Sequence, residues 1–355
     1  MAVISVASLK YGEKLSESVV TRFGNTLFHK GKIISDRDIE ILRAFLIQNV
    51  SIETKSTAAD ESSDESKQME DIQVSTIHPF ITEYENMLNM LKQVFKLANA
   101  SQPIPMMDLR NRLQALINHI DYYNLLSFSA KNWHLQDFIY HNSIMVGLTS
   151  YQLAKWCGMP EKDHMQIALA GLLHDIGTMK VDPAVLEKKE KLTQDELEEV
   201  RKHTVLGYNM LKNVPALNEG VKLCALQHHE REDGSGYPLG LKGDKIHPYA
   251  KVVAIADIYH AMSNPRYYKS SVSAYLVLEE LQKESFGRLA PTIVQAMINK
   301  VTSFQNGTLV KLNDGRVGEI VFADRSHPTR PWVNVNGTIV NLVQERSVYI
   351  QDVIQ

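Results

Sequence analysis

The spacing of hydrophobic positions changes three times along this 355-residue chain, and each change marks a predicted structural boundary. In residues 1–54, short strand-like runs alternate with turn signals, and a helical pattern occurs at 36–47. The strand-like runs lie at 3–6, 19–23 and 50–52. This pattern predicts a small α/β segment at 1–54.

Residues 55–77 begin with KSTAADESSDESKQMEDIQ, in which small, polar and acidic residues dominate. Such a composition offers almost no apolar surface to bury, so the segment is predicted to be a flexible linker. The alternative is an acidic tail that binds a partner.

From residue 78 to 304 the hydrophobic positions follow the period of a helix. Two apolar stripes begin this region, one from Tyr84 to Leu97 and one from Leu109 to Ile117. Core packing is the usual role of such stripes, and the alternative is a homodimer seam formed by the helices at 84–117. Further helices are predicted at 137–157, 163–173, 195–212, 221–229, 252–261, 274–283 and 291–304.

The last segment, 305–355, has alternating polar and apolar positions with turn signals. Asp314-Gly315 and Asn336-Gly337 each lie between strand-like runs, which is typical of β-hairpins. The chain is therefore predicted to be mainly α, with a helical domain at 78–304 between a small α/β segment and a small β segment.

Composition narrows the class of protein. Hydrophobic residues make up 44% and charged residues 22%, as in globular proteins, and the net charge of −3 argues against binding a nucleic-acid polymer. No apolar run approaches the 18 residues typical of a membrane span, and no signal peptide is expected at the N-terminus. Two cysteines, Cys157 and Cys224, are too few for a disulfide framework, so a reducing, cytoplasmic location is predicted.

Nine of the 13 histidines lie between His134 and His260, and four patterns stand out among them. His174-Asp175 ends an apolar stretch, and His203 follows 28 residues after that aspartate. The other two patterns are the adjacent pair His228-His229 and an aspartate, Asp257, within the apolar run KVVAIADIY.

These residue types suit a metal site. Imidazole supplies a nitrogen ligand, and a carboxylate can bridge two cations. Asp257 would be costly to bury in an apolar helix unless a metal or cationic partner neutralised it. A lone histidine such as His119 or His164 is usually an ordinary hydrogen-bonded residue, but the joint pattern predicts a divalent transition metal. Fe or Mn is favoured by the mixed ligands, and the lack of thiolates argues against structural zinc.

The same residues resemble the HD-GYP family, a branch of the HD superfamily of metal-dependent phosphohydrolases. The similarity covers roughly residues 105–304, with the catalytic motifs at 137–269. The resemblance rests on five sequence motifs: LLHDIG at 172–177, KHT at 202–204, HHEREDGSGYP at 228–238, VVAIADIYHAM at 252–262 and RYYK at 266–269.

This resemblance implies hydrolysis of cyclic di-GMP to linear pGpG, and further to GMP, at two divalent metal ions. The implied bridging, catalytic ligand is Asp175, and the chemistry fits a two-metal hydrolase in which cations activate water and offset phosphate charge. The implied metal ligands are His174, Asp175, His203, His228, His229 and Asp257. The implied substrate-binding residues are Gly234, Gly236, Tyr237, Arg266 and Lys269.

Four positions depart from the family pattern. Thr178 stands where the family has a phosphate-contacting lysine, and His260 stands where it commonly has an aspartate. Asn142 occupies the position of a ligand histidine, with His141 one residue early, and Phe138 replaces the glutamate of three-metal members. We therefore predict a binuclear site, with His141, Asn142 and His260 as uncertain ligands.

Two other functions compete with hydrolysis of cyclic di-GMP. A degenerate domain would bind a cyclic dinucleotide or a partner and signal without hydrolysis, as Asn142, Thr178 and His260 would favour. An HD hydrolase of nucleoside phosphates is the third candidate, and the GYP loop argues against it.

Overall fold

The computed structural model describes residues 2–6, 8–20, 26–35, 38–39, 42, 47–53, 79–126, 128, 134–188, 190–264, 272–303 and 307–354. The chain forms two compact units, one comprising residues 76–303 and the other residues 1–75 together with 304–355. The predicted linker at 55–77 and the segment 21–23 lie outside the described residues, as does most of the helix predicted at 36–47.

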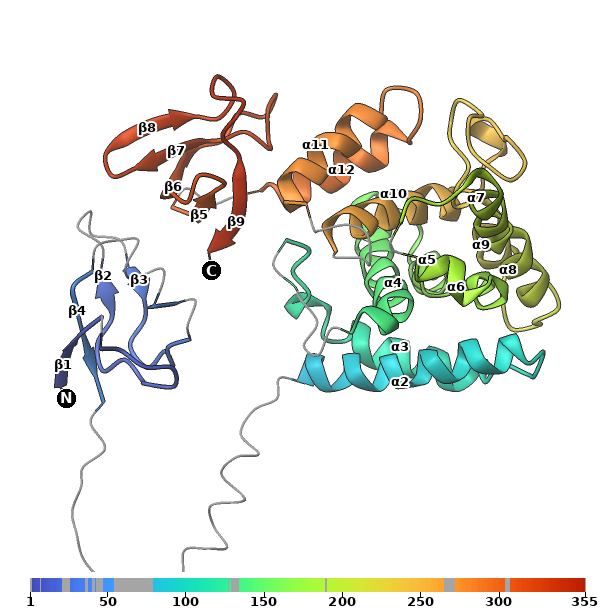
Figure 1. The fold of residues 1–355 in the computed structure, drawn as a ribbon, viewed down its shortest axis with the longest axis horizontal. Helices are drawn as coiled ribbons and strands as arrows, with labels where there is room; N and C mark the ends of the chain where they lie inside the picture. The colour runs from blue at the N-terminus through green and yellow to red at the C-terminus, as the bar shows by residue number, and fades with distance from the viewer. Residues whose placement is uncertain are drawn as a thin grey trace, which may run out of the picture. The chain divides into compact units, whose positions relative to one another are not determined.

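The unit at 76–303 is helical, which confirms the mainly α prediction (Figure 1). Its α-helices are α2 Pro79–Asn99, α3 Met106–Ile117, α4 Phe138–Trp156, α5 Glu161–Leu173, α6 Pro183–Leu186, α7 Gln194–Arg201, α8 His203–Leu211, α9 Glu219–Gln227, α10 Pro248–Ser263, α11 Ala274–Glu284 and α12 Pro291–Val301. Short 3₁₀ helices occur at η1 Ile120–Tyr122, η2 Leu135–Asp137, η3 Ile176–Lys180 and η4 Gly243–Lys245.

The apolar stripes of α2 and α3 are buried inside this unit. Met87, Leu91 and Phe95 on α2 and Leu109 and Leu113 on α3 are fully covered and belong to the main hydrophobic cluster. Core packing therefore accounts for both stripes. A homodimer through these helices remains a prediction, and it would have to use their other faces.

Helices α4 and α5 cross at two glycines. A Cβ on Gly171 would lie 2.9 Å from the Cα of Gly147, so neither helix could approach the other this closely with larger residues there. Because α4 carries Asn142 and α5 ends just before His174, this crossing places two of the predicted site segments next to each other.

Helix boundaries follow local capping signals. Thr193 and Glu196 form a capping box at the start of α7, and the side chain of Asn218 accepts a hydrogen bond from the backbone N–H of Val221 at the start of α9.

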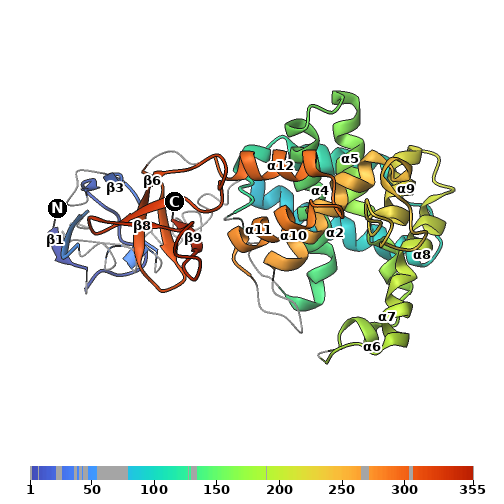
Figure 2. The ribbon, with the colours of Figure 1, turned by 90° about the horizontal axis from the view of Figure 1, so that it is seen from above.

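The single helix predicted at 195–212 is instead two helices, α7 and α8, which meet at Lys202. Figure 2 shows α6 and α7 extending from one side of the helical unit.

The other unit is built of short antiparallel strands. Its strands are β1 Ala2–Ser5, β2 Val19–Val20, β3 Thr26–Phe28, β4 Asn49–Ile52, β5 Leu309–Leu312, β6 Val317–Phe322, β7 Trp332–Val335, β8 Thr338–Asn341 and β9 Ile350–Ile354. β1 pairs with β4, β2 pairs with β3, and the last five form a sheet in the order β8-β7-β6-β5-β9. Ile354 of β9 belongs to the same hydrophobic cluster as Leu15 and Phe28, so the segments from the two ends of the chain contribute to one hydrophobic cluster.

Both predicted hairpins at the end of the chain are present. β5 pairs with β6 across Asp314-Gly315, and β7 pairs with β8 across Asn336-Gly337. Asn336 and Gly337 have φ angles of 52° and 89°, the left-handed conformation that a two-residue hairpin turn requires. Among the described residues, the structure contains no helix with the length and apolar character needed to cross a bilayer.

Candidate metal centre

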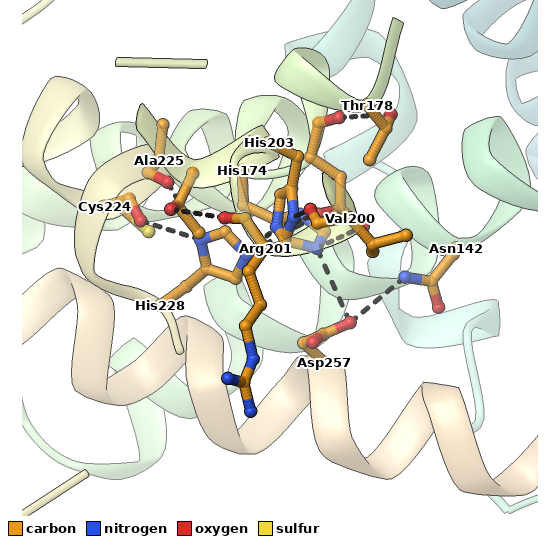
Figure 3. Close-up of polar contacts among 12 residues, drawn as sticks. Asn142, His174, Thr178, Val200, Arg201, His203, Cys224, Ala225, His228 and Asp257 are labelled. Atoms are coloured by element: carbon orange, nitrogen blue, oxygen red, sulfur yellow. Dashed lines mark hydrogen bonds and ion pairs between the residues drawn. The ribbon is translucent and has the colours of Figure 1, made fainter. Parts of the chain in front are cut away.

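Three helix ends and one helix interior supply the predicted ligands. His174 and Asp175 follow α5, His203 is the first residue of α8, and His228-His229 follow α9. Asp257 lies within α10, where its side chain is only 12% exposed. Although these residues are up to 83 positions apart in the sequence, the fold brings them to one centre. Figure 3 shows four of them, His174, His203, His228 and Asp257.

The ligand atoms form two overlapping groups. One group contains Asp175, His203, His228 and His229, and the other contains His174, Asp175 and Asp257. Within each group the candidate ligand atoms lie within 4.8 Å of one another. Asp175 belongs to both groups, which is the arrangement needed for a carboxylate that bridges two cations.

Backbone carbonyls set the tautomers of three histidines. Nδ1 of His174 donates to the Gly171 carbonyl at 2.7 Å, and Nδ1 of His203 donates to the Val200 carbonyl at 2.6 Å. Nδ1 of His228 lies 3.1 Å from the carbonyls of both Cys224 and Ala225 (Figure 3). A carbonyl can only accept, so each Nδ1 carries the proton and each Nε2 is left to present a lone pair to the centre.

The Nε2 atoms face each other and the carboxylates at short range. Nε2 of His203 lies 3.2 Å from Nε2 of His228 and 3.3 Å from Oδ1 of Asp175. Nε2 of His174 lies 3.3 Å from Asp175 and 3.5 Å from Asp257. Lone pairs and carboxylates this close repel one another unless a proton or a metal cation lies among them, so the donor set fits divalent cations.

The electrostatics of the centre favour positive charge between its members. Burial opposes a charged His174 ring, but the carboxylates of Asp175 and Asp257 prevail and raise the pKa of His174 well above its usual value. Burial likewise opposes ionised Asp175, yet the neighbouring imidazoles hold its pKa well below the usual range. Burial, together with His228 and His203, lowers the pKa of His229 well below its usual value. Neutral His229 and ionised Asp175 are the protonation states in which these side chains bind a cation.

The three uncertain ligands lie in different surroundings. Nδ2 of Asn142 donates to Oδ1 of Asp257 at 3.2 Å, so this amide reaches the edge of the centre. His141 is turned toward α2, where a hydrogen bond of 3.0 Å joins its Nδ1 to the hydroxyl of Tyr84. His260 lies in a separate polar group, with Nε2 2.7 Å from Oγ1 of Thr149. Among the described residues, neither His141 nor His260 belongs to a metal-type group.

Thr178 has a structural contact of its own. Its hydroxyl donates to the Asp175 carbonyl at 2.7 Å, within the turn that η3 forms directly after the aspartate. The nearby Lys180 points elsewhere, since its Nζ donates to the Asn99 carbonyl at the end of α2. In this structure neither side chain replaces the phosphate-contacting lysine of the family pattern.

The glycine-rich loop is tightly folded beside the centre. Gly234 has a φ of +84°, and a Cβ on Gly236 would lie 2.5 Å from the His229 carbonyl, so both positions require glycine. Tyr237 stacks on His229 with a ring separation of 4.7 Å. Of the other predicted substrate residues, Arg266 and Lys269 lie outside the described part of the chain.

Sequence reasoning missed the residue that holds this loop. Glu230 is 3% exposed, and its carboxylate accepts the backbone N–H groups of Leu239 at 2.7 Å and Leu241 at 2.9 Å. The signal was present in the sequence, because an acidic side chain directly after two candidate ligands and before a glycine-rich turn could cap that turn. Glu230 therefore positions the loop that carries Tyr237.

Comparisons with known proteins agree on one family of domain. Residues 130–293 match the family model described as HD domain. The chain is 25% identical to the cyclic di-GMP phosphodiesterase PdeB of Borreliella burgdorferi, over 94% of this chain and 91% of that protein. It is 34% identical to the cyclic di-GMP phosphodiesterase PA4108 of Pseudomonas aeruginosa, over 52% of this chain and 44% of that protein.

The chain thus spans most of PdeB and less than half the length of PA4108. Among solved structures, the fold is similar to that of Bd1817, an HDG"Y"P protein from Bdellovibrio bacteriovorus, with a TM-score of 0.52. That similarity covers 83% of this chain and 97% of the Bdellovibrio chain at 18% identity, and it concerns the fold alone.

Proposed function

Because the chain belongs to the HD-GYP family of HD-domain proteins, we propose that it is a metal-dependent phosphodiesterase that hydrolyses cyclic di-GMP to pGpG. The observation that carries the proposal is the convergence of imidazole Nε2 atoms on Asp175, with each Nδ1 proton held by a backbone carbonyl. Hydrolysis of pGpG to GMP would be a second turnover at the same centre.

Two divalent ions, Fe or Mn, fit the donor set. His203, His228 and His229 would hold one ion and His174 with Asp257 the other, and Asp175 would bridge both. When bound, paired cations of this kind activate water near neutral pH and offset the negative charge that develops on phosphorus.

The chain's own residues orient the substrate and keep the ligands in place. The amide of Asn142 donates to Oδ1 of Asp257, the same oxygen that lies 3.5 Å from Nε2 of His174, so this hydrogen bond orients the carboxylate toward the centre. Tyr237 lies against His229 and, with Gly234 and Gly236, forms the wall that would contact a guanine. Arg266 and Lys269 would add cationic contacts, as the sequence motif predicts. Cytoplasmic location also remains a prediction.

A domain that binds cyclic di-GMP without hydrolysing it is the competing function. Two contacts favour it: Asn142 occupies a ligand position as a hydrogen-bond donor, and Thr178 is engaged with the backbone of Asp175. The intact pair of overlapping groups favours hydrolysis, since a binding domain has no need of a bridging carboxylate among five other ligands.

One experiment separates the two functions. The protein purified with Mn²⁺ or Fe²⁺ is incubated with cyclic di-GMP, and the products are resolved by chromatography. We expect pGpG to accumulate, and binding without product would support the sensor function instead.

Metal analysis of Asp175→Ala tests the centre independently, because its metal content should fall by at least half. Unchanged metal content in this variant would refute the bridging role.

A further inference from the structure

Arg201 brings a cation to the glycine-rich loop. It is the last residue of α7 and lies two positions before His203, so its backbone is fixed beside the metal centre. Its guanidinium carbon lies over the ring of Tyr237, 5.1 Å from the ring centroid. Tyr237 in turn stacks on His229, which belongs to the centre.

The ion pair that holds Arg201 is easily exchanged. Nη1 of Arg201 donates to Oε1 of Glu198 at 2.7 Å, and the two side chains are 40% and 54% exposed. Pairs this exposed contribute little to stability because water and salt screen them. A phosphate offers the guanidinium two parallel hydrogen bonds and can displace such a partner.

Two other cations of the motif segments are committed elsewhere. Nζ of Lys180 donates to the Asn99 carbonyl, and Nη1 of Arg231 donates to the carbonyls of Glu230 and His228. The family's lysine position holds Thr178, which is bonded to the Asp175 carbonyl. Lys202 of the KHT motif also pairs with an exposed carboxylate, that of Glu199. Of these two neighbouring cations, Arg201 is the one that lies over the ring of Tyr237.

The depth of the metal centre decides which phosphate Arg201 can meet. His174 and His228 are fully buried, whereas Arg201 is 40% exposed. A cyclic dinucleotide carries two phosphates on opposite sides of its ring, so a phosphate at the buried histidines leaves the second one toward solvent. We propose that Arg201 binds this second phosphate and, through its contact with Tyr237, couples it to the glycine-rich loop. The inference rests on the proposed cyclic dinucleotide substrate.

The test compares variants on two substrates. For Arg201→Ala acting on cyclic di-GMP, we expect KM to rise about tenfold or more with kcat nearly unchanged, as for loss of a charged hydrogen bond made equally in ground and transition states. Bis(p-nitrophenyl) phosphate has a single phosphate, so its KM should not change. Arg201→Lys keeps the positive charge but cannot donate two parallel hydrogen bonds, so its KM for cyclic di-GMP should lie between those of the wild type and Arg201→Ala.

Two further variants sharpen the result. Glu198→Gln removes the competing carboxylate and should lower KM for cyclic di-GMP about twofold. Arg112→Ala is the matched control, because Arg112 is 41% exposed and pairs with Glu83 on α2, outside the centre. Wild-type kinetic constants are expected for this control.

The outcomes separate this inference from the proposed function. An unchanged KM in Arg201→Ala, an equal rise on both substrates, or loss of bound metal would overturn the assignment. If the wild type hydrolyses neither substrate, the affinity of wild type and Arg201→Ala for cyclic di-GMP is compared by calorimetry. Weaker binding by Arg201→Ala then supports the role of Arg201 in a non-hydrolysing domain. Absence of any cyclic di-GMP binding by the wild type overturns the assignment as well.

Discussion

At the scale of single residues, the protonation of each buried histidine depends on which groups face its ring. The carboxylates of Asp175 and Asp257 face His174 and raise its pKa. His260 instead faces the hydroxyls of Thr149 and Tyr123 and the ring of Tyr259. Burial lowers the pKa of His260 to about 3, and only the charge of Asp257 opposes this shift.

His260 should therefore make the fold less stable in acid. Its folded pKa lies below the unfolded one, so the unfolded chain takes up the proton first, and stability is lost as pH falls below about 6.5. Between pH 7.5 and pH 5.0 we expect a loss on the order of 2 kcal/mol from this residue. Urea unfolding of metal-free wild type and His260→Gln at both pH values checks this, and an identical pH dependence of the two proteins would contradict it.

Glu230 is the second residue whose role can be tested alone. Glu230→Gln places an amide N–H₂ against at least one of the two backbone donors of Leu239 and Leu241, so one hydrogen bond is replaced by a donor–donor contact. We expect a loss of about 1–3 kcal/mol of stability and a higher KM for cyclic di-GMP as the loop loosens. Glu232→Gln is the control, because Glu232 pairs with Lys251 at a more exposed position. Equal effects of both substitutions would show that Glu230 has no special role.

At the scale of elements, close contact between 3₁₀ helix η3 and helix α8 places His203 opposite Asp175. A Cβ on Gly177 in η3 would collide with the His203 carbonyl and the Gly207 nitrogen. No side chain fits between these backbones. The glycine after HDI is therefore required by the packing of two elements rather than by its own backbone conformation.

Gly177→Ala should push α8 away and separate the two ligand groups. We expect metal affinity to fall at least tenfold and stability to fall by about 1–3 kcal/mol, as in overpacked interiors. Metal titration with unfolding measurements tests both. Gly207→Ala is the milder control, because its Cβ would meet the Gly177 nitrogen at 3.3 Å. Normal metal binding by Gly177→Ala would disprove the packing argument.

At the scale of the whole molecule, the ligand groups lie in the unit 76–303, and the strands of 1–75 and 304–355 form the other unit. A ligand stabilises the part of a protein that it binds when folded. The two units should therefore respond differently to metal.

Calorimetry of the full chain should show two transitions, of which Mn²⁺ shifts one. At a metal concentration a thousandfold above Kd, the stabilisation of that unit is about 4 kcal/mol. The Asp175→Ala variant should lose this shift while keeping the other transition in place. Movement of both transitions together would mean that the units unfold cooperatively.

Much of the element order could be predicted from the sequence. The helical period predicted helices at 274–283 and 252–261, and the structure has α11 at Ala274–Glu284 and α10 at Pro248–Ser263. The break between α7 and α8 at Lys202 was not predicted, because the apolar spacing continues through it. In the structure this break places His203 within reach of the centre. The sequence motifs also named the residues that the fold brings together at Asp175.

Local spacing alone determined which segments are helices or strands and which residue types are available for metal chemistry, because periodicity and turn residues act over a few positions. Only the tertiary structure decided the partners of those residues. Asn142 meets Asp257 across 115 positions, His260 meets Tyr123 across 137, and Arg201 lies over Tyr237. Such contacts depend on how distant helices pack, and a one-dimensional pattern carries no record of the side-chain directions that packing selects.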